Sequence, residues 1–329
     1  MAETNQDNSL VALSRSLAAA VERVSPAIVA VDARPRVANS GIIWRDGVIV
    51  STNHTVERDE EITVTVAAGR QLPATLAGRD PSTDLAVLRL ATDQPLGISP
   101  VTTTADNELK IGQLALAVGR VHQQRVTATM GIVSVLGDKW RTWRGGEIDR
   151  LIRPDISIFI GFSGGALIDV EGRVVGINTT GLTRGAGLTI PASTINHVVD
   201  ILLEHGRIAR PYLGVSMQPV VLTDELRSKF TLPNESALMI LSVEPESPSG
   251  QAGITLGDVL VTLSDTPVTD TDDVQSVLSG SKVGETLKAT ILRGGELREL
   301  TLTLSERSGE ASRDEHHSGR GWRRSRWRR

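Results

Sequence analysis

Short apolar runs separated by turn-forming residues dominate the chain from residue 27 to about residue 190. Alternate positions are apolar over residues 61–66, and Gly, Asp, Asn and Pro separate this run from its neighbours. Comparable apolar runs occur at residues 47–50, 85–90 and 114–118. Such spacing is typical of many short strands joined by hairpins, as in a β-barrel or a β-sandwich. We therefore expect this region to be all-β.

Helical spacing flanks the β region on both sides. Apolar residues recur every three or four positions over residues 10–24, which predicts one amphipathic helix that Ser25-Pro26 ends. A second helix is predicted over residues 193–206, with Ser193 as its N-cap and Gly206 at its end. This helix closes the first domain, so we place a domain boundary near residue 208.

The remainder of the chain mixes short strands with short helices. With 329 residues the chain has room for about two domains. Helices are predicted at residues 224–230 and 272–278, and a hairpin over residues 287–304 turns at Gly294-Gly295. No apolar period survives beyond residue 308, which predicts disorder. The predicted organisation is a helical segment (1–24), a first domain (25–207), a second domain (208–306) and a disordered tail rich in Arg and Trp (307–329).

Charge and cysteine usage narrow the possible functions. The net charge is −4, but the last eleven residues carry six arginines, so the remainder carries −10. An acidic body is not typical of a dedicated nucleic-acid-binding protein. The absence of cysteine excludes disulfides, thiolate metal sites and a cysteine nucleophile. The N-terminus, MAETNQDNSL, lacks the apolar run of a secretory signal, so we expect a cytoplasmic protein, or a periplasmic one if an upstream signal is missing.

The segment GFSGG at residues 161–165 supplies a candidate nucleophile, Ser163. A serine hydroxyl attacks a carbonyl only when a base takes its proton and backbone donors stabilise the oxyanion. The flanking glycines permit the tight backbone that would direct the N–H groups of Gly161 and Ser163 at one point, forming an oxyanion hole. Taken alone, the segment is equally well interpreted as a glycine-rich turn between strands at residues 156–160 and 166–170.

His54 and Asp84 are the candidate partners of this serine. His54 lies where the apolar run at residues 48–51 meets a polar turn, whereas the other histidines lie in the tail, on a predicted helix or in a predicted surface turn. Asp84 leads directly into the run at residues 85–90, where an unpaired carboxylate would be costly. Taken alone, His54 is also explained as a structural or surface histidine, and Asp84 as a turn residue at the start of a strand. The order His, Asp, Ser across an all-β domain, however, is that of chymotrypsin-like proteases.

Five short segments extend this comparison. They are VSPAIV (24–29), TNH (52–54), TDLAV (83–87), DISIFIGFSGGAL (155–167) and GLTIP (187–191). Together they resemble the HtrA (high-temperature-requirement) family, whose members join a trypsin-like protease domain to one or more PDZ domains. The resemblance implies a mainly β fold, in which a chymotrypsin-like double β-barrel (25–207) precedes a PDZ domain (208–306), a small β-barrel with two helices.

The second domain has its own resemblance. The segment SPSGQAGITLGDVL at residues 247–260 is similar to the SPAxxAGLxxGD segment of PDZ domains. The PDZ resemblance implies that a loop of Tyr212, Leu213, Gly214 and Val215 binds the C-terminal carboxylate of a peptide, which adds to the sheet as a strand. Val274 and Leu278, one helical turn apart, would line the pocket for the last side chain of the peptide. The alternative is that all these residues are core positions, foremost Leu256 and Val259.

The function implied by the resemblance is that of an HtrA-type serine endopeptidase. It would cleave unfolded or misfolded polypeptides with Ser163, His54 and Asp84, without a metal or another cofactor, and its PDZ domain would bind peptide C-termini. Phe162 and Ile160 depart from the family pattern, which has Asn directly before the nucleophile and Pro two residues earlier. The competing interpretation is a catalytically impaired, protease-like chaperone or peptide-binding adaptor, in which Phe162 blocks the oxyanion hole.

Three further expectations concern partners and regulation. Many members of the family that this chain resembles are trimers built by aromatic residues of the N-terminal segment. Here no aromatic residue precedes Trp44, so a homotrimer would use the aliphatic face of residues 10–24 instead. The tail interleaves Trp with Arg, which suits weak binding to anionic surfaces, although a tail without function explains it equally well. Residues 136–150 fall where the family has an activation-sensing loop, so we expect them to report PDZ occupancy.

Overall fold

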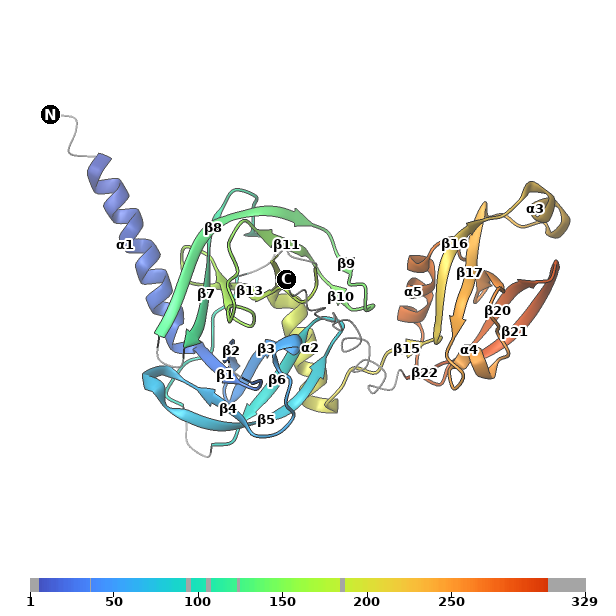
Figure 1. Ribbon diagram of the computed structural model, residues 1–329. Helices are drawn as coiled ribbons and strands as arrows, with labels where there is room; N and C mark the ends of the chain where they lie inside the picture. Colours follow the sequence, from blue (N-terminus) through green and yellow to red (C-terminus); the bar gives the residue numbers. More distant parts are fainter. Residues whose placement is uncertain are drawn as a thin grey trace, which may run out of the picture. The chain divides into compact units, whose positions relative to one another are not determined.

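The computed structural model describes residues 6–35, 37–92, 96–104, 108–122, 125–183 and 187–306. The chain divides between Ile208 and Ala209 into two compact units (Figure 1). The predicted disordered tail lies outside the described residues.

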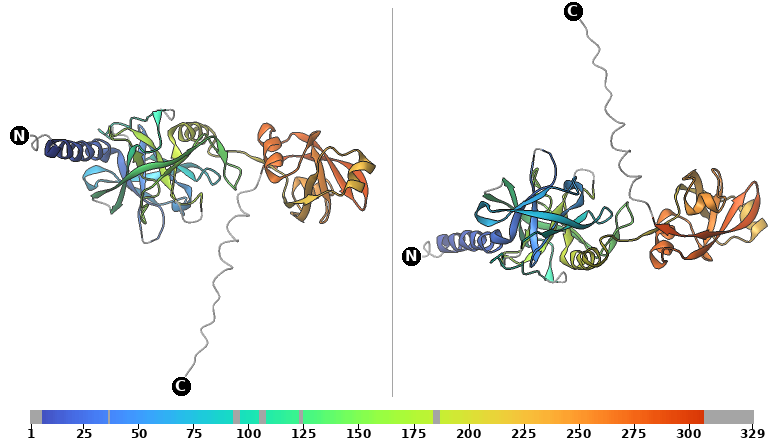
Figure 2. Two further views of the ribbon diagram at one scale, coloured as in Figure 1. Left: turned by 90° about the horizontal axis from the view of Figure 1, so that it is seen from above. Right: turned by 90° about the horizontal axis from the view of Figure 1, so that it is seen from below.

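The helix α1 (Gln6–Val24) extends away from the barrels of the first unit (Figures 1 and 2). Its C-terminal half packs on the core through Leu17, Ala20, Val21 and Val24. The helix begins four residues before the predicted start and ends as predicted at Ser25-Pro26, which belong to the 3-10 turn η1 (Ser25–Ala27). The N-terminal half of α1 has no comparable packing within the described unit.

Two closed six-stranded barrels form the body of the first unit, which confirms the predicted chymotrypsin-like double β-barrel. The first barrel has the strand order β1 (Ile28–Asp32), β2 (Asn39–Arg45), β3 (Val48–Thr52), β6 (Leu85–Leu90), β5 (Gln71–Asp80) and β4 (Ile62–Thr65). The second has the order β11 (Leu151–Pro154), β14 (Leu188–Pro191), β13 (Val174–Thr179), β12 (Ala166–Ile168), β7 (Leu114–His122) and β8 (Arg125–Gly137). Shorter elements are η2 (Asn53–Thr55), η3 (Ala67–Gly69), β9 (Trp140–Arg141) and β10 (Glu147–Ile148).

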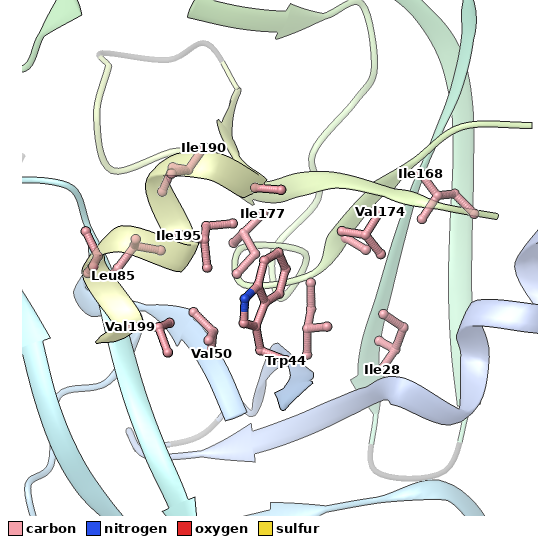
Figure 3. Packing of buried hydrophobic residues seen from close by; sticks show 14 of the residues in the cluster. Ile28, Trp44, Val50, Leu85, Ile168, Val174, Ile177, Ile190, Ile195 and Val199 are labelled. Atoms are coloured by element: carbon pink, nitrogen blue, oxygen red, sulfur yellow. The ribbon is translucent and has the colours of Figure 1, made fainter. Parts of the chain in front are cut away.

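One apolar core joins the two barrels to the helix α2 (Ala192–His205). Figure 3 shows the ring of Trp44 surrounded by side chains from both barrels and from this helix. Trp44 is buried, and its indole N–H donates to Asn196 Oδ1 over 2.8 Å, which satisfies the polar atom of the ring. Because the same core contains residues of both barrels, it fixes one barrel against the other.

The start of α2 differs from the prediction. Gly206 ends the helix as expected, with a φ of 75° that glycine adopts without strain. Ser193 was predicted as the N-cap, but this is wrong: the helix begins at Ala192, and Pro191 occupies the N-cap position without a side-chain cap bond. The reason is that β14 runs directly into the helix, so the last residue of the strand takes the capping position.

The second unit is a sheet packed against short helices. The sheet has the order β16 (Val215–Val221), β17 (Ser236–Val243), β18 (Val259–Leu263), β20 (Thr286–Arg293) and β21 (Glu296–Thr303), with β19 (Thr266–Pro267) beside β18. A separate pair joins β15 (Pro211–Tyr212) to β22 (Ser305–Glu306). The helices are α3 (Asp224–Phe230), α4 (Pro248–Gln251) and α5 (Thr271–Gly280). The predicted hairpin turn at Gly294-Gly295 joins β20 to β21, and both glycines have positive φ.

An ion pair between buried Asp258 and partly exposed Arg293 holds the segment between α4 and β18. The Asp258 carboxylate accepts hydrogen bonds from the backbone N–H of Thr255 and from the Arg293 guanidinium, each over 2.7 Å. Burial alone would raise the pKa of Asp258, but the hydrogen bonds from Arg293 and Thr255 outweigh it and leave the pKa below its ordinary value. Leu256 is 72% exposed, so the core position expected for it is wrong; the residue lies in the turn, outside the sheet.

Candidate active site

His54 and Asp84, predicted from separate segments, lie side by side in the first barrel. His54 belongs to η2, directly after β3, and Asp84 directly precedes β6, the strand that pairs with β3. His54 Nδ1 is 2.8 Å from Asp84 Oδ2, and the backbone N–H of His54 donates to Oδ1 over 2.9 Å. The Asp84 side chain is only 5% exposed, whereas that of His54 is 34% exposed. The pair therefore has a buried acid behind an accessible imidazole.

The backbone around Asp84 is tightly specified. Asp84 has a φ of 59°, a left-handed conformation that is uncommon for residues other than glycine. The preceding turn is held by the Asp80 carboxylate, which accepts hydrogen bonds from the Ser82 N–H over 3.1 Å and from Thr83 Oγ1 over 2.8 Å. The Asn53 N–H in turn donates to the Asp84 carbonyl over 2.9 Å. These bonds fix the carboxylate relative to η2.

Two residues of the second barrel complete the surroundings of this pair, and the sequence analysis missed both. Thr179, the last residue of β13, donates from Oγ1 to Asp84 Oδ2. A Cβ on Gly181 would lie 2.7 Å from both His54 Nδ1 and Asp84 Oδ2, so only glycine fits there. No local pattern identifies these positions, because their partners lie about a hundred residues earlier in the chain.

Ser163 lies in the turn before β12, in the second barrel. The residue is 6% exposed, and its hydroxyl is 3.4 Å from Thr180 Oγ1. Among the described residues, no hydrogen bond joins Ser163 Oγ to His54. The strand predicted at residues 156–160 is absent from the described structure; Phe159 and Ile160 are instead 57% and 78% exposed, in an irregular segment.

The backbone of the turn that carries Ser163 depends on glycine at two positions. Gly161 and Gly164 have φ values of 93° and 87°, which side-chain-bearing residues rarely adopt. Within the described ranges, neither the Gly161 N–H nor the Ser163 N–H has a hydrogen-bond acceptor.

The side chain of Phe162, which stands where the family has Asn, points into the protein interior. It is 1% exposed and packs edge to face on Phe159, with ring centroids 5.9 Å apart. Gly119 on β7 lies beside the ring, because a Cβ there would be 3.4 Å from Phe162 Cγ, an ordinary van der Waals distance. The ring is thus part of the core beneath the turn.

The hairpin of β9 and β10 lies within residues 136–150, the predicted sensing loop, and contacts the turn that carries Asp84. Thr142 Oγ1 donates to the Ser82 carbonyl over 2.7 Å. Gly146 lies so close that a Cβ there would be 2.3 Å from the same carbonyl oxygen. At the tip of the hairpin Trp143 is 73% exposed, with the Arg144 guanidinium 4.5 Å from its ring centroid. The hairpin therefore has direct contact with the Asp84 turn.

In the second unit, the predicted carboxylate-binding loop precedes the edge strand β16. No acceptor for the N–H groups of Leu213 and Gly214 occurs among the described residues, although their carbonyls accept from Ser249 and Glu244. Gly214 has a φ of 75°. Leu213, Val274 and Leu278 are buried in one cluster, which Val215 contacts, while Tyr212 is half-buried.

A metal site and a membrane-spanning helix each set requirements for the described ranges. Across them, no three His, Asp or Glu side chains gather closely enough to hold a metal ion. No described helix is both long enough and apolar enough to span a membrane.

Comparisons with known proteins agree with this architecture. A trypsin-like peptidase domain profile matches residues 39–177, and a PDZ domain profile matches residues 211–304. A probable periplasmic serine endoprotease DegP-like of Brucella suis is 33% identical over 293 residues, covering 85% of this chain and 56% of the relative. The serine protease Do-like HtrA of Lactococcus lactis is 32% identical, covering 82% of this chain and 71% of the relative.

Solved structures of similar architecture include HtrA-type protease AlgW with a decapeptide. It is 27% identical with a TM-score of 0.68, covering 89% of this chain and 99% of that chain. The serine endoprotease from Yersinia pestis is 29% identical with a TM-score of 0.68, covering 87% and 96% respectively. The chain spans 56%, 58% and 54% of the curated relatives from Brucella suis, Rhizobium meliloti and Rickettsia conorii.

The names of these relatives correct one prediction. The relatives from Brucella suis, Rhizobium meliloti and Rickettsia conorii are all named periplasmic. The cytoplasmic location expected for this chain is therefore wrong. That expectation rested only on the polar composition of the first ten residues.

Proposed function

Since this chain belongs to the HtrA family of trypsin-like serine proteases with a PDZ domain, we propose that it is an active endopeptidase that cleaves unfolded or misfolded polypeptides. The observation that carries the proposal is the contact of 2.8 Å between His54 Nδ1 and the buried carboxylate of Asp84. A buried acid bound to one ring nitrogen leaves the other nitrogen of His54 to act as a base on Ser163.

The proposed reaction is acyl transfer to Ser163. Ser163 Oγ attacks the peptide carbonyl carbon while its proton passes to His54 Nε2, and Asp84 stabilises the imidazolium that results. The N–H groups of Gly161 and Ser163 donate to the oxyanion. His54 then protonates the leaving amine, and water releases the acyl group from Ser163. For the first step, the Ser163 hydroxyl exchanges its contact with Thr180 for one with His54.

Burial of Phe162 favours this proposal over a catalytically impaired chaperone or adaptor. The competing interpretation required the Phe162 ring to block the oxyanion hole, but the ring is 1% exposed and packs on Phe159. Neither oxyanion donor is consumed by another acceptor among the described residues.

Labelling by a fluorophosphonate tests whether Ser163 is activated. These reagents react with a serine whose proton is taken by a neighbouring base, so we expect one label per chain, on the tryptic peptide that contains Ser163. Prior heat unfolding should abolish the labelling, because it separates Ser163 from His54. A folded protein that takes up no label would favour the impaired adaptor, and a label on another serine would contradict the assignment of the nucleophile.

We propose in addition that the second unit binds peptide C-termini. Two unpaired N–H groups at Leu213 and Gly214 suit a carboxylate, and the edge position of β16 leaves a strand that a peptide can extend. Leu213, Val274 and Leu278 offer an apolar floor for the last side chain. The structure of the similar HtrA-type protease AlgW contains a decapeptide.

A free C-terminus should therefore decide the affinity of a peptide for this unit. We expect a labelled peptide that ends in an aliphatic residue to bind at least about tenfold more tightly as the free acid than as the amide, because the amide loses the charge-assisted hydrogen bonds. Fluorescence polarisation with the intact chain measures both forms. Equal affinities would contradict a carboxylate site at Leu213 and Gly214.

A homotrimer remains a proposal that the exposed half of α1 supports. Leu10 and Leu13 are 69% and 43% exposed, which leaves an aliphatic face available for association. Light scattering on the intact chain distinguishes a trimer from a monomer. Binding of the tail to anionic surfaces also remains a proposal, carried by its composition, because the tail lies outside the described residues.

A further inference from the structure

Ser40, a residue of β2 without an assigned role so far, holds the segment that leads to the nucleophile. We name residues 159–163 the oxyanion loop. The carbonyl of Gly161 in this loop accepts two hydrogen bonds from Ser40, one from its backbone N–H over 3.0 Å and one from its hydroxyl over 2.6 Å. No other donor reaches this carbonyl among the described residues. Ser40 is completely buried.

The surrounding backbone approaches Ser40 more closely than side chains would permit. A Cβ on Gly164, next to the nucleophile, would lie 2.0 Å from the Ser40 carbonyl oxygen. A Cβ on Gly119 of β7 would lie 2.7 Å from Ser40 Oγ. The Ser40 carbonyl in turn accepts from Ser51 Oγ over 2.8 Å. Ser40 therefore makes close contacts with the first barrel, with the turn that carries Ser163 and with β7 of the second barrel.

Arg120 determines the direction of the Ser40 hydroxyl. The backbone N–H of Arg120 donates to Ser40 Oγ over 2.9 Å, so the single proton of the hydroxyl is directed to the Gly161 carbonyl. The Arg120 side chain is 4% exposed and donates to the carbonyls of Ile28 and Ser25 over 2.8 and 3.2 Å. Arg120 is thereby anchored on the N-terminal segment, which supports its backbone from behind.

Such support matters because oxyanion donors contribute most when they are fixed before the reaction. Within the loop the Phe162 ring is buried and the Phe162 N–H donates to the Phe159 carbonyl over 3.0 Å. Gly161 itself has a positive φ and no side chain, so its position depends on the hydrogen bonds that its carbonyl accepts from Ser40. We propose that Ser40 is a positioning residue that holds Gly161 in place, and with it the oxyanion donors, through the hydrogen bond of its hydroxyl. This inference rests on the proposed function and adds to it a residue that contacts no substrate.

The variant Ser40→Ala tests the inference, because it removes the hydroxyl and keeps the backbone hydrogen bond. We expect kcat for a peptide substrate to fall by about 10- to 100-fold with KM within about twofold, since oxyanion donors act mainly in the transition state. Affinity for a peptide boronate, whose adduct occupies the oxyanion hole, should fall in parallel. The matched control is Ser134→Ala, which removes a similar hydroxyl-to-carbonyl bond of 2.8 Å on β8 and should leave kcat and KM unchanged.

Thermal unfolding of both variants separates a loss of stability from a loss of positioning. If Ser40→Ala does not fold, Ser40→Cys keeps a side chain of similar shape with a weaker donor, and its kcat should lie below that of the wild type. An unchanged kcat in the folded variant, or a rise in KM alone, overturns the role of Ser40. An inactive wild type would instead overturn the proposed function, and with it this inference.

Discussion

Replacing Ser163 by alanine should reduce the hydrolysis of an unfolded protein by roughly 10⁴- to 10⁶-fold, the scale seen when a serine protease loses its nucleophile. In the proposed mechanism the Ser163 oxygen forms the acyl-enzyme, and neither the oxyanion donors nor His54 replaces it. The fold should persist, because Ser163 Oγ makes a single long contact, with Thr180, among the described residues. Release of labelled peptides from a fluorescent casein measures the rate over this range.

The matched control for this experiment is Ser157→Ala. Ser157 is exposed and precedes the oxyanion loop by two residues, so its hydroxyl is not needed for the proposed reaction. Its rate should equal that of the wild type. If Ser163→Ala retained full activity in a preparation free of other proteases, the nucleophile would have to be sought elsewhere in the chain.

The second large effect is expected for Asp84→Asn, which should lower kcat by roughly 10⁴-fold. The carboxylate accepts from His54 Nδ1, from the His54 N–H and from Thr179. An amide at this position presents a donor where His54 Nδ1 or Thr179 needs an acceptor, so it favours the tautomer of His54 that cannot accept the proton of Ser163. Because asparagine has the shape of aspartate, the turn should keep its structure.

A double variant shows whether Asp84 acts through the same unit as Ser163. Residues that act together lose activity non-additively, so Ser163→Ala with Asp84→Asn should be no slower than Ser163→Ala alone. The charge control is Asp46→Asn, which neutralises an exposed aspartate of the first barrel and should leave kcat unchanged. A single Asp84→Asn variant within tenfold of the wild type would contradict the orienting role.

The short-range pattern of apolar residues and the order of the motifs along the chain predicted part of the fold and of the candidate site. Apolar runs predicted β6 with its observed bounds, and the motifs singled out His54 and Asp84, which the structure places 2.8 Å apart. The strand predicted at residues 156–160 is wrong: isoleucines alternate there as in a strand, but Ile160 is 78% exposed. Alternation reports burial of one face only when the segment pairs with a neighbour, and this one does not.

Contacts between distant segments could not be predicted from one sequence. Thr179 and Gly181 meet the His54–Asp84 pair only because the second barrel is packed on the first, and Ser40 meets Gly161 across 121 positions of the chain. A threonine, a glycine or a serine at a strand end has many local explanations. Their contribution to the candidate site follows from tertiary packing, which hydrophobic periodicity does not encode.

The shared core around Trp44 has a consequence for the nascent chain during synthesis. His54 and Asp84 belong to the first barrel and Ser163 to the second, and the core that joins the barrels includes α2, the last helix of the first unit. A nascent chain that has not yet emerged as far as α2 lacks part of this core, so its nucleophile and its base are not held together. We therefore expect the proposed proteolytic activity only in chains in which α2 has joined this core.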